Sequence, residues 1–172
     1  ATQTAIEQAG PYRLPEAQLD RFLLKATIGY PDHASTLRIL EGSDVKAHEA
    51  RLQPIVTADA VLEMADQARH VHVDPSVNDY VSRLVEATRS ATEVRLGVSV
   101  RGALALIRSA KTLAAASGRH YVIPDDVKSL AEPVLAHRLV LDTEAEFDGV
   151  TTSGIIGQLL LETPPPSDRQ DV

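Results

Sequence analysis

Hydrophobic residues recur at helical spacing over most of the chain after residue 56. The strongest stretch runs from about residue 100 to residue 117, and Gly118 follows it as a residue suited to a left-handed helix end. A second helix is predicted to begin at Pro75 or Ser76. The apolar faces predicted for these two helices are Ala103, Leu106, Ile107, Ala110, Leu113 and Ala114 in the first, and Val77, Tyr80, Val81, Leu84 and Val85 in the second.

Shorter helices are predicted on both sides of this pair. Asp32, Thr57 and Ser153 are N-cap residue types, and each precedes an apolar helical pattern. Another helix opens at Pro124 and is expected to break near Pro133, because proline removes a backbone donor. The positions expected to face inward are Leu37 and Leu40 in the first of these helices, Val61, Leu62, Ala65 and Ala68 in the second, and Ile155, Ile156, Leu159 and Leu160 in the last.

The first 31 residues have a different pattern, typical of the end of an α/β core. Residues 15–22 form a short predicted helix, since Pro15 suits the first helical position. Residues 23–30 are an apolar run, which predicts a buried strand closed by Pro31. Residues 96–99 are expected to be a loop.

The fold class expected from these patterns is mainly α. Residues 1–31 would be the truncated edge of an α/β core, residues 32–162 a helical-bundle domain, and residues 163–172 a disordered tail. The 23–30 strand would lack sheet neighbours, so we expect residues 1–31 to be poorly packed or paired with another chain, and proteolysis to cut near residue 32.

Composition narrows the class of partner. The net charge of −7 repels phosphodiester backbones, which makes nucleic acid a poor partner. The chain has no cysteine, so it has no disulfide or thiolate metal site, a feature compatible with the cytoplasm, which is the expected location. No apolar run reaches the roughly 18–20 residues that a membrane span requires.

One string carries a family resemblance. The run LPEAQLDRF at residues 14–22, preceded by Thr2-Gln3, Ile6-Glu7-Gln8, Gly10 and Tyr12, resembles the MoxR branch of the AAA+ ATPases. The resemblance continues in family order almost to the C-terminal end and identifies the helical bundle with the family's lid domain. It implies an intact protein that binds ATP and Mg²⁺, forms a ring that is expected to be a hexamer, and remodels client proteins as a chaperone does. Partners with a von Willebrand factor A domain are implied in the same way.

The nucleotide-binding motifs of such an ATPase are absent from the sequence. No G-x-x-x-x-G-K-[ST] loop occurs, nor does an apolar strand that ends in Asp-Glu. We therefore expect the 172-residue chain to be the C-terminal half of the ATPase, and neither to bind the cofactors nor to hydrolyse ATP alone.

Arg21 is the first candidate catalytic residue. It ends the short predicted helix, whose Leu19, Phe22 and Leu23 are expected to be buried on one face. Within the family string it matches an arginine finger, which acts in trans on ATP bound by the next subunit. The alternative is an arginine that offsets the helix dipole.

Arg101 and Thr4 are the other candidates that the resemblance supplies. Arg101 matches the sensor 2 arginine, although Val100 stands where the family usually has proline. Arginine in the first turn opposes the helix dipole, which favours an anionic partner over a solvated side chain. Whether Arg101 acts in its own subunit or in a neighbour is open. Thr4 stands where the family has the sensor 1 asparagine, which leaves open whether turnover is reduced.

The remaining polar residues are interpreted as structural. Asp125 and Asp126 suit the start of a helix. His70 and His72 have the spacing of a metal pair but lack an evident third ligand, so no metal site is expected. Solvated faces or inter-subunit contacts are expected for Arg108, Lys111, Glu132, His137 and Arg138.

An alternative function is left open. The chain could be a non-catalytic helical protein-interaction module, and nucleotide titration would separate the two hypotheses. A relationship to helicases of the minichromosome-maintenance class is disfavoured by the acidic balance.

Overall fold

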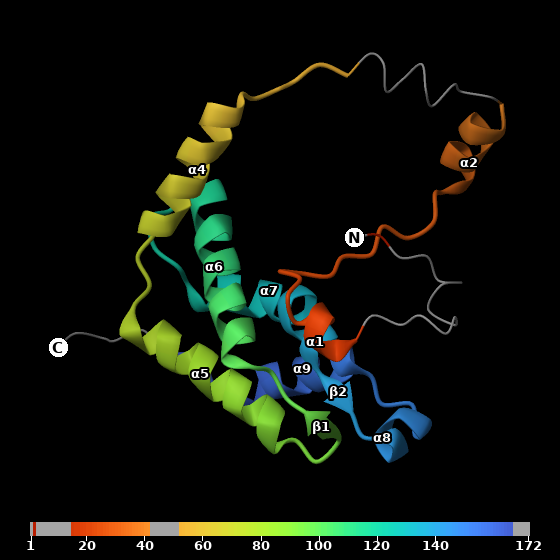
Figure 1. Ribbon diagram of the computed structural model, residues 1–172, viewed down its shortest axis with the longest axis vertical. Coiled ribbons are helices and arrows are strands. Elements are labelled where there is room, and N and C mark those ends of the chain that lie inside the picture. Colours follow the sequence, from red (N-terminus) through yellow and green to blue (C-terminus); the bar gives the residue numbers. More distant parts are fainter. Residues whose placement is uncertain (1, 3–14, 42–51, 167–172) are drawn as a thin grey trace. The chain divides into compact units, whose positions relative to one another are not determined.

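The computed structural model describes residue 2, residues 15–41 and residues 52–166. Within them the protein is mainly helical, as predicted, with one two-stranded antiparallel sheet (Figure 1). The elements in chain order are α1 (Glu16–Leu19), α2 (His33–Leu40), α4 (Ala58–His70), α5 (Pro75–Ser90), β1 (Val94–Leu96), α6 (Val100–Ala116), α7 (Pro124–Leu135), the 3₁₀ turn η2 (Ala136–Arg138), β2 (Val140–Leu141), α8 (Thr143–Phe147) and α9 (Thr152–Glu162).

The described chain divides into two compact units. One contains residues 15–25 and 67–166, and the other contains residues 26–41 and 52–66. The first unit holds the hydrophobic core and the candidate site. None of the described helices is long and apolar enough to cross a membrane.

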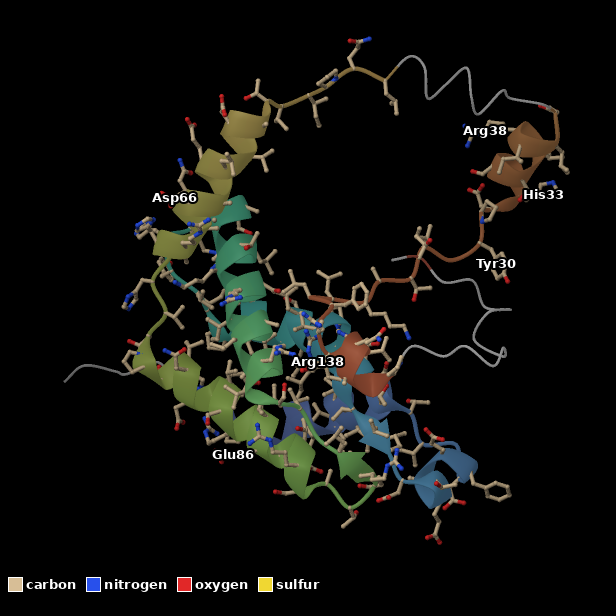
Figure 2. The ribbon with its side chains drawn as sticks, viewed as in Figure 1. Tyr30, His33, Arg38, Asp66, Glu86 and Arg138 are labelled. Carbon is tan, nitrogen blue, oxygen red and sulfur yellow. The ribbon has the colours of Figure 1, made fainter. Side chains whose placement is uncertain are left out.

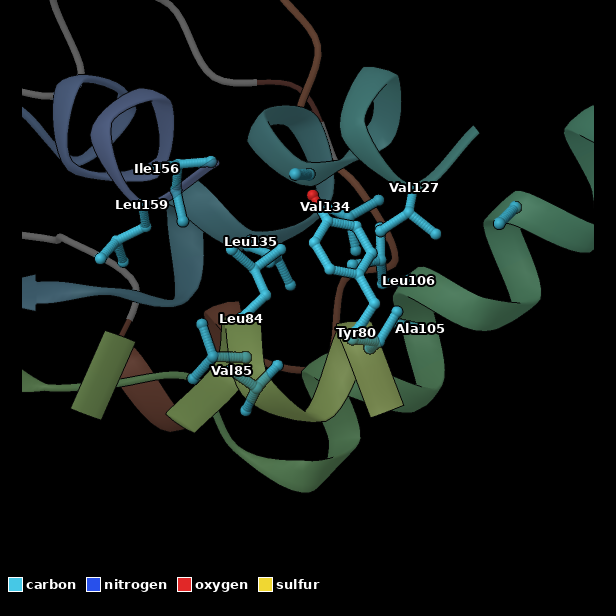
Figure 3. Close-up of a cluster of buried hydrophobic side chains, with 14 of the residues drawn as sticks. Tyr80, Leu84, Val85, Ala105, Leu106, Val127, Val134, Leu135, Ile156 and Leu159 are labelled. Carbon is cyan, nitrogen blue, oxygen red and sulfur yellow. The ribbon is translucent and has the colours of Figure 1, made fainter. Parts of the chain in front are cut away.

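Four helices enclose the core: α5, α6, α7 and α9 (Figure 3). The whole apolar face predicted for α5 is buried, as the helical period requires. Full burial of each large aliphatic side chain contributes about 1.5–3 kcal/mol. The largest fully buried side chains include Tyr80, Leu84, Leu106, Leu135 and Ile156, which come from all four helices.

The long helix α6 ends as predicted. Gly118 takes a positive φ of 73°, which costs a residue without Cβ little. The N–H of Arg119 donates to the carbonyl of Ala114 at 2.9 Å, and the N–H of Gly118 donates to that of Ala115 at 2.9 Å, so the last carbonyls of the helix are satisfied. Most of the predicted inner face is buried or half-buried, and Gly102, Ala105 and Ser109 are buried as well.

The predicted strand over 23–30 is wrong. These residues form no strand and are exposed, with Leu24 46% and Ile28 100% accessible. A strand needs a neighbouring strand to satisfy its backbone groups, and no described residue supplies one. One backbone bond attaches the beginning of the run to the bundle, from the N–H of Lys25 to the carbonyl of Pro133 at 2.8 Å.

The predicted break near Pro133 is also wrong, because α7 continues to Leu135. A proline inside a helix costs about 3 kcal/mol. Val134 and Leu135 follow it and are fully buried, and their burial offsets that cost.

The apolar faces predicted for α2 and the first part of α4 are exposed. Asp32 does cap α2, since its carboxylate accepts from the N–H of Ser35 at 2.7 Å. Yet Leu40 is 76% and Leu62 is 65% exposed, because the second unit has no buried cluster among its described residues. The cap residues and the apolar period therefore predicted these helices correctly, but no core in the described part of the chain buries these apolar faces.

The smaller elements show what the pattern missed. β1 and β2 pair antiparallel, with Leu96 opposite Val140, where a loop was expected to begin. The last helix is capped by Thr151 and not by Ser153, since the Thr151 hydroxyl accepts from the N–H of Gly154. At the start of the predicted tail, Thr163 is buried and the carbonyl of Pro164 accepts from Arg83 at 3.0 Å.

Candidate functional site

The candidate site begins with the turn that presents Arg21. α1 is a single helical turn, and the N–H groups of Arg21 and Phe22 donate to the carbonyls of Gln18 and Leu19 at 3.1 Å each. Arg21 therefore lies two residues beyond α1 and is exposed. The predicted burial of its neighbours is wrong for Phe22 and Leu23, which are 39% and 51% exposed.

Asp20 connects this turn to the beginning of α6. Its Oδ2 lies 3.4 Å from Nη1 of Arg101, and the Ser99 hydroxyl donates to both carboxylate oxygens at 3.2 Å. Ser99 occupies the N-cap position of α6 but makes no capping bond with its side chain. The residue next to Arg21 is thus held by the residues that begin the helix of Arg101.

Arg101 keeps most of its side chain accessible, at 62%. The first turn of α6 contains no acidic residue, so Asp20 provides the anion that offsets an arginine placed against the helix dipole. The structure thus brings the predicted Arg101 into contact with the residue that precedes the predicted Arg21.

Arg138 is the member of the site that sequence reasoning missed. The expectation of a solvated or inter-subunit arginine is wrong, because its side chain is 2% exposed. Its Nε lies 3.2 Å from Oδ1 of Asp20. Arg138 belongs to η2, the turn that packs against α1, and Figure 2 labels it near that helix. Burial lowers the pKa of Arg138, and the charge of Asp20 opposes that shift.

His137 supports the same turn from the neighbouring position. Its Nε2 lies 3.2 Å from the carbonyl of Phe22 and 2.7 Å from Nη1 of Arg138. Burial lowers the pKa of His137, and the charge of Arg138 lowers it further, although the hydrogen bond with Phe22 acts in the opposite direction. A neutral His137 therefore accompanies the charged Arg138.

The remaining candidates lie elsewhere. Thr4 lies outside the described residues. Arg108 and Glu132 are exposed, as expected, whereas Lys111 is half-buried and donates to the carbonyl of Arg69 at 2.8 Å. In the described part of the chain no three His, Asp or Glu side chains are grouped to hold a metal ion.

The acidic pair at the start of α7 is structural, as predicted. Asp126 accepts from the N–H of Ile123 at 3.0 Å, and Arg119 donates to both of its oxygens at 2.6 and 2.8 Å. Burial raises the pKa of Asp126, but the hydrogen bonds from Arg119 and Ile123 outweigh that effect and lower the pKa overall. This ion pair stabilises the start of α7.

Similarities to known proteins identify the family of this chain. Residues 86–159 match the family described as the AAA lid domain. The chain is 38% identical over 169 residues to chaperone MoxR1 of Mycobacterium tuberculosis, covering 93% of this chain and 44% of that protein. It is 29% identical to protein MoxR of Paracoccus denitrificans, covering 85% of this chain and 49% of that protein. The chain belongs to the MoxR family of AAA+ ATPases.

Two further likenesses agree with this assignment to the MoxR family. The uncharacterised protein YeaC of Bacillus subtilis is 37% identical over 172 residues, covering 100% of this chain and 54% of that protein. The crystal structure of a candidate ATPase from Cytophaga hutchinsonii superposes with a TM-score of 0.84 at 34% identity, covering 96% of this chain and 53% of that one. The expected family and the helical lid fold are confirmed, and the chain spans about half the length of the curated relatives it matches.

The matched lid region begins within α5 and ends within α9. It therefore contains Arg101 and Arg138, whereas Arg21 and Asp20 precede it. Arg21 and Arg101 are both exposed, and the planar donors of an exposed guanidinium can bind phosphate oxygens.

Proposed function

We propose that this region contributes Arg21 and Arg101 to the ATP site of a MoxR-type ATPase whose hydrolysis cycle remodels client proteins. Arg21 would act as an arginine finger on nucleotide held by the next subunit. Arg101 would act as sensor 2 and bind the β- or γ-phosphate. The name of the relative chaperone MoxR1 supports the remodelling role, and the ring, its hexameric size and von Willebrand factor A domain partners belong to the same proposal.

The observation that carries the proposal is the contact of Asp20 with Arg101. Both candidate arginines are exposed, and the residue adjacent to one is ion-paired with the other at 3.4 Å. An arginine in a water-excluded phosphate site can stabilise the charge that develops during phosphoryl transfer. Solvent exposure in the isolated region is what such a role requires, since the phosphate comes from outside it.

The same contact favours action of both arginines on one nucleotide. The turn of Arg21 and the start of α6 belong to the same packed unit. If Arg21 reaches across a subunit boundary, Arg101 lies at that boundary too. We therefore assign Arg101 to the neighbour's nucleotide as well, so that it acts in trans.

Point variants of the whole ATPase test this function. We expect Arg21→Ala to lower kcat for ATP hydrolysis by about 10³-fold or more, the range measured for arginine fingers. We expect Arg101→Ala to lower kcat and to weaken nucleotide affinity, because it removes a contact to a phosphate present before and during the reaction. Steady-state ATPase assays and nucleotide titration measure both effects.

Arg108→Ala is the matched control, since Arg108 is exposed on the same helix two turns beyond Arg101. It should leave kcat and affinity unchanged. Wild-type kinetics in both test variants would contradict the proposal, and a region that binds a protein partner but never influences nucleotide would support the non-catalytic interaction module instead.

A further inference from the structure

Arg138 forms a network that the proposed function does not use. Its guanidinium is directed at the backbone on both sides of Arg21. Nη2 donates to the carbonyl of Phe22 at 2.5 Å and to that of Asp20 at 3.4 Å, and Nη1 donates to the carbonyl of Leu23 at 3.2 Å. Nη1 also contacts the carbonyl of Val134 in α7. One side chain of the lid therefore binds three carbonyls around the candidate finger.

Arg138 is also connected to Arg101, the second candidate arginine, through the carboxylate of Asp20. Its Nε pairs with Oδ1 of Asp20, while Arg101 pairs with Oδ2 of the same carboxylate. Asp20 is partly shielded, at 24% exposure, and Arg138 is nearly inaccessible. The buried arginine therefore fixes the carboxylate that holds Arg101.

A buried arginine is costly to desolvate, and pairing of its donors offsets that cost. In Arg138 both Nη atoms donate to carbonyls, whereas Nε makes no hydrogen bond and lies 3.2 Å from Asp20 as an ion pair. Fixing the backbone of a short turn by carbonyl contacts from a distant helix restricts the orientation of the residue it carries. A misplacement of about 1 Å in a reacting group can lower a rate about 10²-fold. Loss of the contacts from Arg138 could therefore change the rate of a reaction in which Arg21 takes part.

We propose that Arg138 is a positioning residue that clamps the Arg21 turn to the lid and aligns Arg21 and Arg101 as one unit. The inference rests on the proposed function of those two arginines. It adds that the finger moves with the lid of its own chain, so that a displacement of the lid is transmitted to the nucleotide of the neighbour.

Hydrogen exchange in the full-length protein tests the clamp without reference to activity. Arg138→Met should raise amide exchange over residues 16–25 by about tenfold or more, because it removes charge-assisted hydrogen bonds to that turn. Amides of α5 should be unchanged. Arg138→Lys keeps the charge but not the fork of donors, so it should give an intermediate effect and serves if the methionine variant does not fold.

Arg119→Met is the matched control, since Arg119 also binds a carboxylate of the lid, that of Asp126, but does not contact the Arg21 turn. It should leave exchange over 16–25 at the wild-type level. Equal exchange over 16–25 in wild type and Arg138 variants would overturn the inference.

ATP hydrolysis by the full-length protein tests the positioning role. Arg138→Met should lower kcat by about 10–100-fold, with KM for ATP changed by less than about threefold. In an Arg21→Lys background the same substitution should lower kcat by less than about twofold, because it acts through Arg21. An equal fall in both backgrounds would overturn the inference.

The two proposals fail separately. If Arg21→Ala leaves kcat unchanged, the proposed function is wrong, and exchange over 16–25 still decides whether Arg138 clamps the turn. If Arg21→Ala abolishes turnover while Arg138→Met changes neither exchange nor kcat, the clamp is wrong and the proposed function stands.

Discussion

Gly102 makes room for the buried Arg138 side chain. A Cβ at this position would lie 3.0 Å from Cδ of Arg138 and 2.4 Å from Cγ1 of Val98. Contacts this close cannot be accommodated without moving a side chain or the helix. The packing of Arg138 therefore requires glycine at position 102, next to Arg101 in α6.

Gly102→Ala should lower the free energy of unfolding by about 1–3 kcal/mol, the usual cost of overpacking. Gly157→Ala is its control, because Gly157 lies in α9 with no atom within 4 Å of an added Cβ. That variant should raise the free energy of unfolding by roughly 0.5–1 kcal/mol through helix propensity. Urea unfolding of both variants measures the difference, and a stabilising Gly102→Ala would contradict the packing described here.

Individual residues differ in how far the sequence predicts them. Arg21 was predicted from the family string that surrounds it, and Arg101 from the family resemblance together with its unfavourable position in the first turn of a helix. Arg138 gave no signal, since its partner Phe22 lies 116 residues away and a lone arginine after a helix is usually solvated. The role of a buried arginine whose partners are distant in the sequence can be recognised only from the folded structure.

At the scale of elements, local sequence signals predicted where the helices lie better than they predicted which helix faces are buried. The helical period of α5 and its start at Pro75 or Ser76 predicted a helix whose apolar face is buried. Asp32 predicted the start of α2 equally well, yet its apolar residues are exposed. Caps and periodicity are local, whereas burial depends on distant segments. The β1–β2 pair was missed for the same reason, because two strands of three and two residues carry almost no pattern.

The start of α7 makes a pH prediction. The pKa of Asp126 is lowered in the folded chain, so its contribution to stability is present above the unfolded value of about 3.9 and is lost as pH falls through the folded value. Asp126→Asn should therefore lower the free energy of unfolding at pH 7 by about 1–3 kcal/mol and flatten its decline below about pH 4. Denaturant unfolding between pH 7 and pH 3 measures this.

Asp125→Asn is the control for that experiment. Asp125 is 78% exposed and pairs with Lys128 on the surface at 3.1 Å, an interaction worth about 0–1 kcal/mol. It should leave the acid limb of the stability curve close to wild type. Parallel curves for wild type and Asp126→Asn would show that the Arg119–Asp126 pair does not stabilise α7.

At the scale of the whole molecule, the lid and the Arg21 turn belong to one compact unit, whereas the described residues 26–41 and 52–66 belong to another. The expected domain boundary near residue 32 stays a prediction. Under the proposed function, motion of the lid carries Arg21 with it, because α1 packs against η2. Coupling between neighbouring sites in a ring would then pass through Asp20 and Arg138.

The most direct test of this account is a subunit-mixing experiment with the whole ATPase. One preparation carries Arg21→Ala and the other carries a substitution of the phosphate-binding lysine supplied by the rest of the protein, so each is inactive alone. If Arg21 acts across the subunit boundary, mixed rings regain ATPase activity, because some interfaces pair an intact lysine with an intact Arg21. Arg101→Ala should complement the lysine variant in the same way. Mixed rings without activity, at ratios where both subunits co-assemble, would contradict the account.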